Sequence, residues 1–281
     1  MPRGAPRLLI RLWRGLARGV LLPLVFVAPG AAAQGVASIQ GQDCHQPDGP
    51  PGHVVAESES GPLVRARYVG ATTAYGHGVL GDAIEAEGLL VQIASDDGPV
   101  CATVQAGPNR VFEDVGPRLF DVTQNGIAEV LVVASHQKKG ARLEIYGLSD
   151  SGGGFQLLAA GPYIGQRFRW LAPVGAADLD GDGRVEIAYV DRPHLAKTLR
   201  IWRWTDAGLI PVADAPGVTN HRIGDPFIIG GIRDCGTLPE MILASADWSR
   251  LLTLRFDGAN IARQDLGSYG ADAMDDALAC R

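Results

Sequence analysis

The sequence contains none of the short motifs that mark the commonest enzyme active sites. It has no G-x-S-x-G nucleophile elbow, no H-E-x-x-H pair, no Walker loop and no dinucleotide-binding glycine fingerprint. Its four cysteines form no C-x-x-C pair, which argues against a zinc ribbon or a redox motif. On these grounds a non-catalytic role is favoured over an enzymatic one.

Long apolar runs are also missing. The run at 20–28 is shorter than the roughly 20 residues that cross a bilayer. It follows five arginines and precedes three alanines, which is the order of a secretory signal peptide with its cleavage site. We therefore expect residues 1–33 to be removed. The mature protein would then be exported to the periplasm or the extracellular space, with no membrane span.

Excess positive charge is absent as well. The chain has a net charge of −6, and losing five arginines would leave 20 basic against 31 acidic residues, a net charge of −11. Nucleic-acid binding needs clustered Lys and Arg, so this acidic composition argues against a nucleic-acid partner. No basic amphipathic helix is present that would lie on a membrane surface.

Four cysteines in an exported chain predict two disulfide bonds. Cys44, Cys101, Cys235 and Cys280 allow three connectivities, and the sequence does not choose among them. A bond between Cys235 and Cys280 is one possibility, and it would tie down the C-terminus.

Glycine (37) and proline (18) are abundant, and no stretch after residue 33 holds a helical apolar period long enough to predict a helix of consequence. Residues 34–62 are polar and rich in Gly, Pro and Ser, which indicates a flexible leader. Short apolar runs broken by Gly, Asp and Pro begin at Leu63 and predict many strands. We expect one folded domain over 63–281.

Related segments recur along this domain, at 75–107, 119–148, 176–204 and 230–256. Each predicts a strand, an acidic loop and three further strands joined by turns. A four-stranded meander repeated about every 50 residues is typical of a β-propeller blade. We therefore expect an all-β fold, a small propeller of four or five blades. A two-sheet sandwich with chance acidic turns is the alternative.

The most acidic loop lies in "AADLDGDGRVEIAYVD" at 176–191. Asp178, Asp180 and Asp182 occupy alternate positions, a main-chain carbonyl near Arg184 can add an oxygen, and Glu186 stands at position nine. Calcium takes six to eight oxygen ligands, so this spacing favours Ca²⁺, while Mg²⁺ fits less well because it keeps several waters. An EF-hand is excluded because position twelve is Tyr189, inside a predicted strand.

This loop resembles that of FG-GAP (VCBS-type) repeats, the blades of integrin-α-like propellers, whose pattern is D-x-D-G-D-G-x-x-[DE]. All nine positions match at 178–186, the match at 121–129 is partial, and those at 78–87 and 232–240 are degraded. The Phe-Gly and Gly-Ala-Pro flanks of the family are missing or altered. The resemblance implies a calcium-stabilised propeller over 63–281. Its implied ligands are Asp178, Asp180, Asp182 and Glu186, with a weaker second site at Asp121, Asn125 and Glu129.

In an up-and-down blade the second turns lie at the end opposite the acidic loops. The residues that the pattern brings to that end include several cations and one aromatic: His77, Arg110, Arg169, Trp170, His221 and Arg222. In an acidic protein such a group favours an anionic partner, which could be a protein, a glycan or a small ligand. Alternatively these side chains pair with acids such as Glu113 or pack between blades. The runner-up function is a phosphodiesterase or glycan-acting hydrolase that uses this basic face.

Overall fold

The computed structural model describes residues 38–40, 44–58, 61–149 and 154–281; the expected signal peptide lies outside these residues. Nineteen strands and one short helix make up the elements, so the all-β prediction is confirmed. Central strands such as β8 (Glu129–His136) are buried along nearly their whole length. A strand covered on both faces needs such a continuous apolar run. By contrast β13 (Thr198–Thr205) alternates between buried and half-buried residues.

The first sheet has ten antiparallel strands in two meanders. The first meander runs in the order β2-β3-β4-β5-β1 and the second in the order β7-β8-β9-β10. Strand β6 joins the meanders, since it pairs with β8 over three residues and with β4 at the single pair Ala86 and Phe112. The remaining strands of this sheet are β1 (Ser38–Gln40), β2 (Ala56–Glu57), β3 (Leu63–Thr72), β4 (Glu85–Ile93), β5 (Val100–Gln105), β6 (Arg110–Phe112), β7 (Arg118–Phe120), β9 (Gly140–Leu148) and β10 (Phe155–Ala160).

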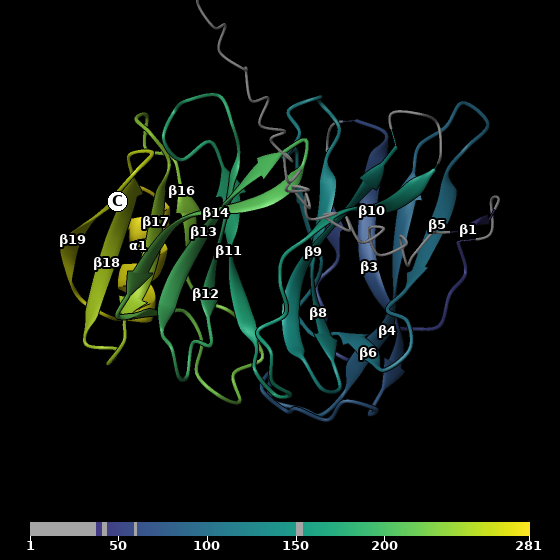
Figure 1. Cartoon of the computed structure of the whole chain (residues 1–281), viewed down its shortest axis with the longest axis horizontal. Helices are drawn as coiled ribbons and strands as arrows, with labels where there is room; N and C mark the ends of the chain where they lie inside the picture. Colours follow the sequence, from purple (N-terminus) through teal and green to yellow (C-terminus); the bar gives the residue numbers. More distant parts are fainter. Residues whose placement is uncertain (1–37, 41–43, 59–60, 150–153) are drawn as a thin grey trace, which may run out of the picture. The chain divides into compact units, whose positions relative to one another are not determined.

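Two further sheets complete the fold, and each is a single antiparallel meander (Figure 1). The second sheet consists of β11 (Leu171–Ala177), β12 (Glu186–Asp191), β13 and β14 (Gly208–Pro216). The third consists of β15 (Val218–Thr219), β16 (Gly231–Arg233), β17 (Glu240–Ser245), β18 (Arg250–Phe256) and β19 (Ile261–Ser268). Four meanders therefore follow one another along the chain.

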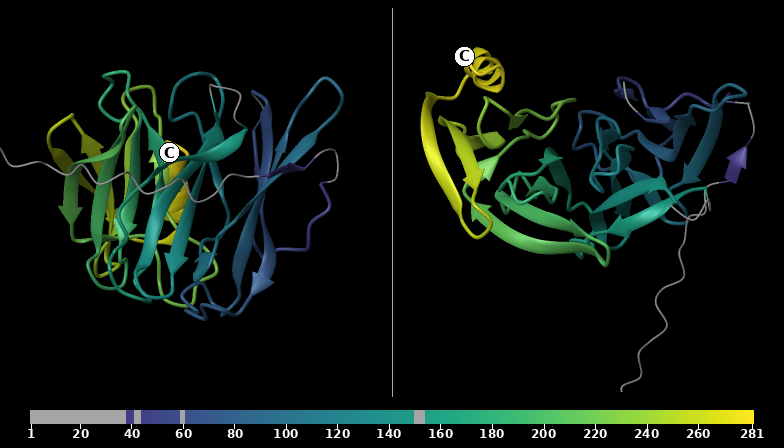
Figure 2. Two further views of the ribbon diagram at one scale, coloured as in Figure 1. Left: turned by 45° about the vertical axis from the view of Figure 1, so that its right-hand side comes forward. Right: turned by 90° about the horizontal axis from the view of Figure 1, so that it is seen from above.

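Within this part of the chain, neighbouring meanders pack through apolar faces and lie one after another in chain order (Figure 2). Val133 and Leu143 of the second meander share a core with Ile187 of the third. Ile201 of the third shares another with Leu243 of the fourth. Burial of these faces, at about 25 cal/mol per Å² of apolar surface, holds the meanders together.

The antiparallel connections define two ends of the strands. The "loop end" carries the loops 121–128, 178–185 and 234–239, and the "hairpin end" carries the turns 137–139, 192–197 and 246–249. The loop 73–84 joins β3 to β4, the second and third strands of the first meander, so the degraded acidic loop expected at 78–87 is not a first turn. Gln137 Nε2 donates to the Ala74 carbonyl at 2.5 Å, and the Gly224 amide donates to the Val79 carbonyl at 3.0 Å. This loop therefore reaches the hairpin end and contacts the fourth meander.

Two disulfide bonds link distant parts of the described chain. Cys44 is bonded to Cys101, and Cys235 to Cys280, with Cα–Cα distances of 5.3 and 5.7 Å. The prediction of two disulfides is confirmed, and the Cys235–Cys280 pairing considered above is the one observed. The first bond, together with the pairing of β1 with β5 and of β2 with β3, holds part of the expected leader against the first meander.

The C-terminal helix α1 (Ala271–Leu278) was not expected from the sequence. It has eight residues, about two turns, which is too short to show a helical period. Met274 and Ala277 pack against Ile242 and Leu251 of the third sheet. Among the residues whose positions are described, no helix has the length and apolar character needed to cross a membrane.

Candidate functional site

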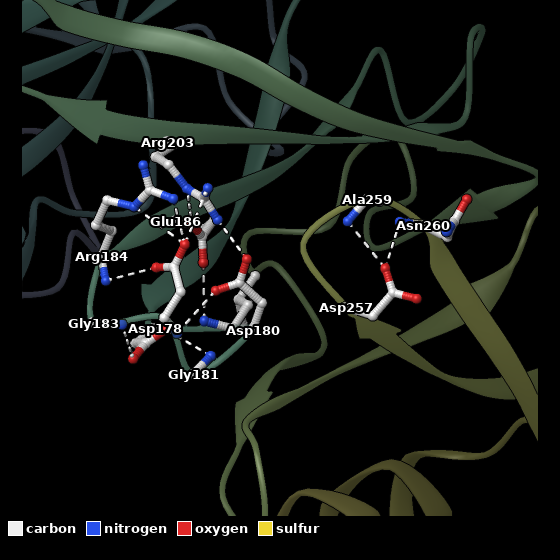
Figure 3. Close-up of polar contacts among 12 residues, drawn as sticks. Asp178, Asp180, Gly181, Gly183, Arg184, Glu186, Arg203, Asp257, Ala259 and Asn260 are labelled. Atoms are coloured by element: carbon white, nitrogen blue, oxygen red, sulfur yellow. Dashed lines mark hydrogen bonds and ion pairs between the residues drawn. The ribbon is translucent and has the colours of Figure 1, made fainter.

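The acidic loop 178–185 joins β11 to β12 and is closed by its first aspartate. The Asp178 carboxylate accepts hydrogen bonds from the amides of Gly181 at 2.8 Å and Gly183 at 3.0 Å (Figure 3). Both glycines have left-handed backbones, with φ of 76° and 83°, a conformation that other residues adopt only at a cost. The Asp-Gly alternation of the sequence therefore produces this tight turn.

Three carboxyl groups of this loop converge. Asp178, Asp180 and Glu186 each place an oxygen within 4.8 Å of the others, and they are the one set of three such side chains in the described part of the chain. Glu186 is fully buried at the start of β12, where it accepts a hydrogen bond from the Leu179 amide at 3.0 Å. Clustered carboxylates require a positive partner.

Arg203 supplies that partner. It lies on β13 directly opposite Glu186, and its Nε donates to Glu186 at 2.5 Å while a terminal nitrogen donates to Asp180 at 2.5 Å (Figure 3). Its third nitrogen is 3.2 Å from Asp182. Burial opposes the charge on Arg203, but hydrogen bonds to Glu186 and Asp180 outweigh it and raise the pKa of the guanidinium.

Asp182 and Arg184 form an exposed pair at the rim of the loop. The Arg184 guanidinium donates to the Asp182 carboxylate at 2.5 and 3.1 Å, and this hydrogen bond lowers the pKa of Asp182. The Asp182 carboxylate is therefore paired with two arginines, Arg184 and Arg203. It does not belong to the converging set of Asp178, Asp180 and Glu186.

The donor set suits a hard divalent cation such as Ca²⁺, because it consists of carboxylate oxygens within reach of one another. The guanidinium of Arg203 stands where such a cation would neutralise Asp180 and Glu186. It brings one positive charge to three converging carboxyl groups. A divalent ion would therefore compete with Arg203 at this position.

A buried glutamate begins the second strand in the second, third and fourth meanders, at Glu129, Glu186 and Glu240, whereas the buried Glu85 begins β4, the third strand of the first meander. Burial raises the pKa of Glu186, and hydrogen bonds from Arg203 only partly offset it. Burial also opposes ionisation of Glu240. There, hydrogen bonds from Thr253, Arg233 and Arg255 outweigh burial and lower the pKa.

Glu129, in the predicted weaker site, lacks such an arginine. Within the described ranges no ion pair involves it, and a Cβ at Gly147 on β9 would lie 2.9 Å from its side chain. Glu129 accepts hydrogen bonds from the Val122 amide at 2.8 Å and from Thr123, yet burial still raises its pKa. Asp121 accepts the amides of Asn125 and Gly126, so the predicted residues Asp121 and Asn125 bond to the loop backbone.

At the hairpin end, two of the predicted ligand-binding residues contact one buried acid, Glu113, and a third packs against one of them. His77 Nδ1 is 2.5 Å from the Glu113 carboxylate, and Trp170 Nε1 donates to the Glu113 carbonyl at 2.8 Å. The ring of His221 packs against that of Trp170 at 5.0 Å, and both residues are buried. These side chains follow the alternative expected above, which was pairing with acids or packing between blades.

The other predicted cations do not contact Glu113. Arg110 pairs with the buried Glu144, and Arg169 donates to the Phe168 carbonyl at 3.1 Å. Arg222 is exposed and its guanidinium lies 4.1 Å from the centre of the Trp248 ring. Arg169 and Arg222 thus have no acidic partner among the ion pairs found in the described ranges.

A cationic cluster around Tyr163 was missed at the sequence level. The Arg142 guanidinium lies 4.5 Å and the Lys139 ammonium 5.4 Å from the centre of the Tyr163 ring, and the exposed Lys138 is adjacent. Arg110 is close enough to lower the pKa of Tyr163, although burial raises it more. The basic residues of this cluster are visible in the sequence as the turn "HQKKGAR" at 136–142. Nothing in the sequence, however, indicates that Tyr163 lies beside them.

The pKa of Glu85 leads to the first prediction. Burial, followed by the nearby Glu113 and Asp82, raises this pKa from 4.5 to about 9. The folded protein therefore holds a proton that the unfolded chain releases, so this contribution to stability is complete below pH 4.5 and is lost as pH rises toward 9. Glu85→Gln should lose less stability than the parent protein between pH 5 and 9 in denaturant titrations, whereas Glu87→Gln, at an exposed position on β4, should behave like the parent. Parallel pH curves for all three proteins would contradict this assignment.

Arg203 gives a second prediction. Arg203→Met leaves Glu186 and Asp180 without their cation and should lower the free energy of unfolding by about 3–5 kcal/mol in calcium-free buffer. Arg184→Met, which removes an exposed pair, should cost much less than Arg203→Met. Chemical denaturation of both variants measures the difference. Equal losses would show that Arg203 does not neutralise the cluster.

Comparison with known proteins does not assign this chain to a family. No protein-family model matches this chain, and a search of curated proteins finds no match. The likeness of 178–186 to FG-GAP loops therefore stays a resemblance carried by those nine residues.

Proposed function

We propose that this protein is an exported, non-catalytic binding module, a small β-propeller of four blades with Ca²⁺ in its best-formed acidic loop. Four successive antiparallel meanders, three of which begin their second strand with a buried glutamate, support this architecture. The two disulfides fit the oxidising compartment that export implies. The ligand is anionic and binds at the hairpin end.

One observation carries the binding proposal: the two ends of the strands differ in charge. The converging carboxyl groups lie at the loop end, whereas Lys139 and Arg142 lie against Tyr163 at the hairpin end, with the exposed Lys138 next to Lys139 in the chain. The Arg110 Nε is buried there without a hydrogen-bond partner. A sulfate, phosphate or carboxylate group would satisfy such donors, and an aromatic ring beside them suits a sugar or another flat ligand face.

Calcium has a structural role in this proposal. Asp178, Asp180 and Glu186 would hold it, and its charge would neutralise the acids that Arg203 neutralises alone in its absence. The second loop, with Asp121, Asn125 and Glu129, contains fewer acids and belongs to the proposal only as a weaker site.

Calcium binding predicts a change in thermal stability. At a calcium concentration 100-fold above its dissociation constant, the protein should gain about 2.7 kcal/mol, measured as a rise in melting temperature that EDTA reverses. Asp178→Asn should abolish the rise, and Arg203→Met should bind Ca²⁺ more tightly than the parent because the competing guanidinium is gone. A melting temperature unchanged by millimolar Ca²⁺ in both the parent and Arg203→Met would contradict a calcium site.

Anion binding predicts retention on a dextran sulfate resin despite the acidic net charge. The variant carrying both Lys138→Gln and Lys139→Gln should elute at lower salt than the parent, since the cations around Tyr163 provide the attraction. The matched control carries Arg250→Gln and Arg281→Gln, which removes two exposed cations that are paired with Asp265 and Asp276. Equal shifts in the two variants would mean that only net charge matters.

A hydrolase is the second candidate, and one contact favours it. The buried Glu113 carboxylate holds His77 Nδ1 at 2.5 Å, and its other oxygen accepts the Ser135 hydroxyl. A carboxylate that orients a histidine in this way leaves Nε2 able to act as a general base. Product formation from a phosphodiester or glycoside during binding assays would favour this candidate.

A further inference from the structure

Two histidines from different loops meet at the hairpin end. His194 lies in the turn between β12 and β13, and His221 follows β15. His194 Nε2 is 3.0 Å from His221 Nδ1, and the two ring planes are inclined by 60°. His221 is 1% exposed and His194 is half-buried, so the pair is open to solvent on one side only.

The hydrogen bonds around the rings determine which nitrogens are available. His221 Nε2 is 2.9 Å from the Asp225 carbonyl, which only accepts, so Nε2 carries the proton and Nδ1 faces His194 with a lone pair. His77 Nδ1 is held by the Glu113 carboxylate, which leaves Nε2 free. Histidines that bind metals are oriented in the same way, by a carbonyl or carboxylate on the nitrogen away from the metal.

Both rings of the pair are neutral at pH 7. Burial, followed by the neighbouring His221, lowers the pKa of His194 to about 4, and burial also lowers the pKa of His221. Neutral imidazole is the form that binds metal ions.

The separation of the pair fits two adjacent ligands of one ion. Metal–nitrogen bonds of about 2.0–2.1 Å place two neighbouring ligand nitrogens about 2.9–3.4 Å apart, for angles between square and tetrahedral. The observed distance of 3.0 Å lies in this range. An N–H···N hydrogen bond gives the same distance, so metal binding and a simple hydrogen bond are the two outcomes to separate.

We propose that His194 Nε2 and His221 Nδ1 form a two-histidine binding site for a divalent transition metal such as Zn²⁺. Imidazole nitrogens favour Zn²⁺, Ni²⁺ and Cu²⁺ over Ca²⁺. His77 lies at the same end of the strands but does not complete a set of three converging ligands with this pair. This site shares no residue with the acidic loop and does not depend on the proposed function.

Titration of the folded, disulfide-bonded protein with Zn²⁺ after EDTA treatment and buffer exchange tests the site. Calorimetry should give one saturable Zn²⁺ per chain that 1 mM Ca²⁺ does not displace. His194→Ala and His221→Gln should each weaken binding at least about tenfold. Co²⁺ should give a visible absorption band that is lost in His194→Ala.

The matched control is His136→Ala, because His136 lies at the same end and its Nδ1 accepts the Lys138 amide. It should bind Zn²⁺ like the parent. Circular dichroism establishes folding, and His194→Ala decides the question if His221→Gln fails to fold, since His194 is half-buried. Unchanged affinity in folded His194→Ala, or the absence of saturable Zn²⁺ binding, would leave only a hydrogen bond between the two rings and overturn the proposal.

Discussion

The need to neutralise or protonate a buried carboxyl group at the start of an inner strand of each meander is the constraint on which this structure depends. Removing a carboxylate from water costs several kcal/mol unless hydrogen bonds or a cation compensate. Glu85, Glu129, Glu186 and Glu240 occupy this position in the four meanders. The residues around each glutamate determine how the adjoining loop folds. They also determine which glutamate can exchange its protein partner for a metal ion.

The four positions meet this need in different ways. Arg203 lies opposite Glu186, while Arg233 and Arg255 both contact Glu240. Glu129 accepts hydrogen bonds from the Val122 amide and from Thr123. Among the described residues no such donor is found for Glu85, and burial raises its pKa to about 9. The third meander is distinctive because its glutamate lies within a loop rich in further carboxylates. It is therefore the position where a divalent ion competes most directly with the internal arginine.

The sequence predicted much of this architecture because its signals are local. The strands, the repeating units and the turn at 178–186 follow from residues adjacent in the chain, and the two disulfides follow from an even number of cysteines in an exported protein. Arg203 was not predictable in its role, since it lies 17 residues beyond Glu186 and meets it only through strand register. Likewise, the contact of His77 with Glu113 depends on the path of the loop 73–84, which no local pattern indicates.

A crystal structure determined in millimolar Ca²⁺ tests the central claim most directly. The account predicts an ion bonded to Asp178, Asp180 and Glu186, with the Arg203 guanidinium moved away from Asp180. A map with Arg203 still bonded to both Asp180 and Glu186, and only water beside Asp178, would contradict it.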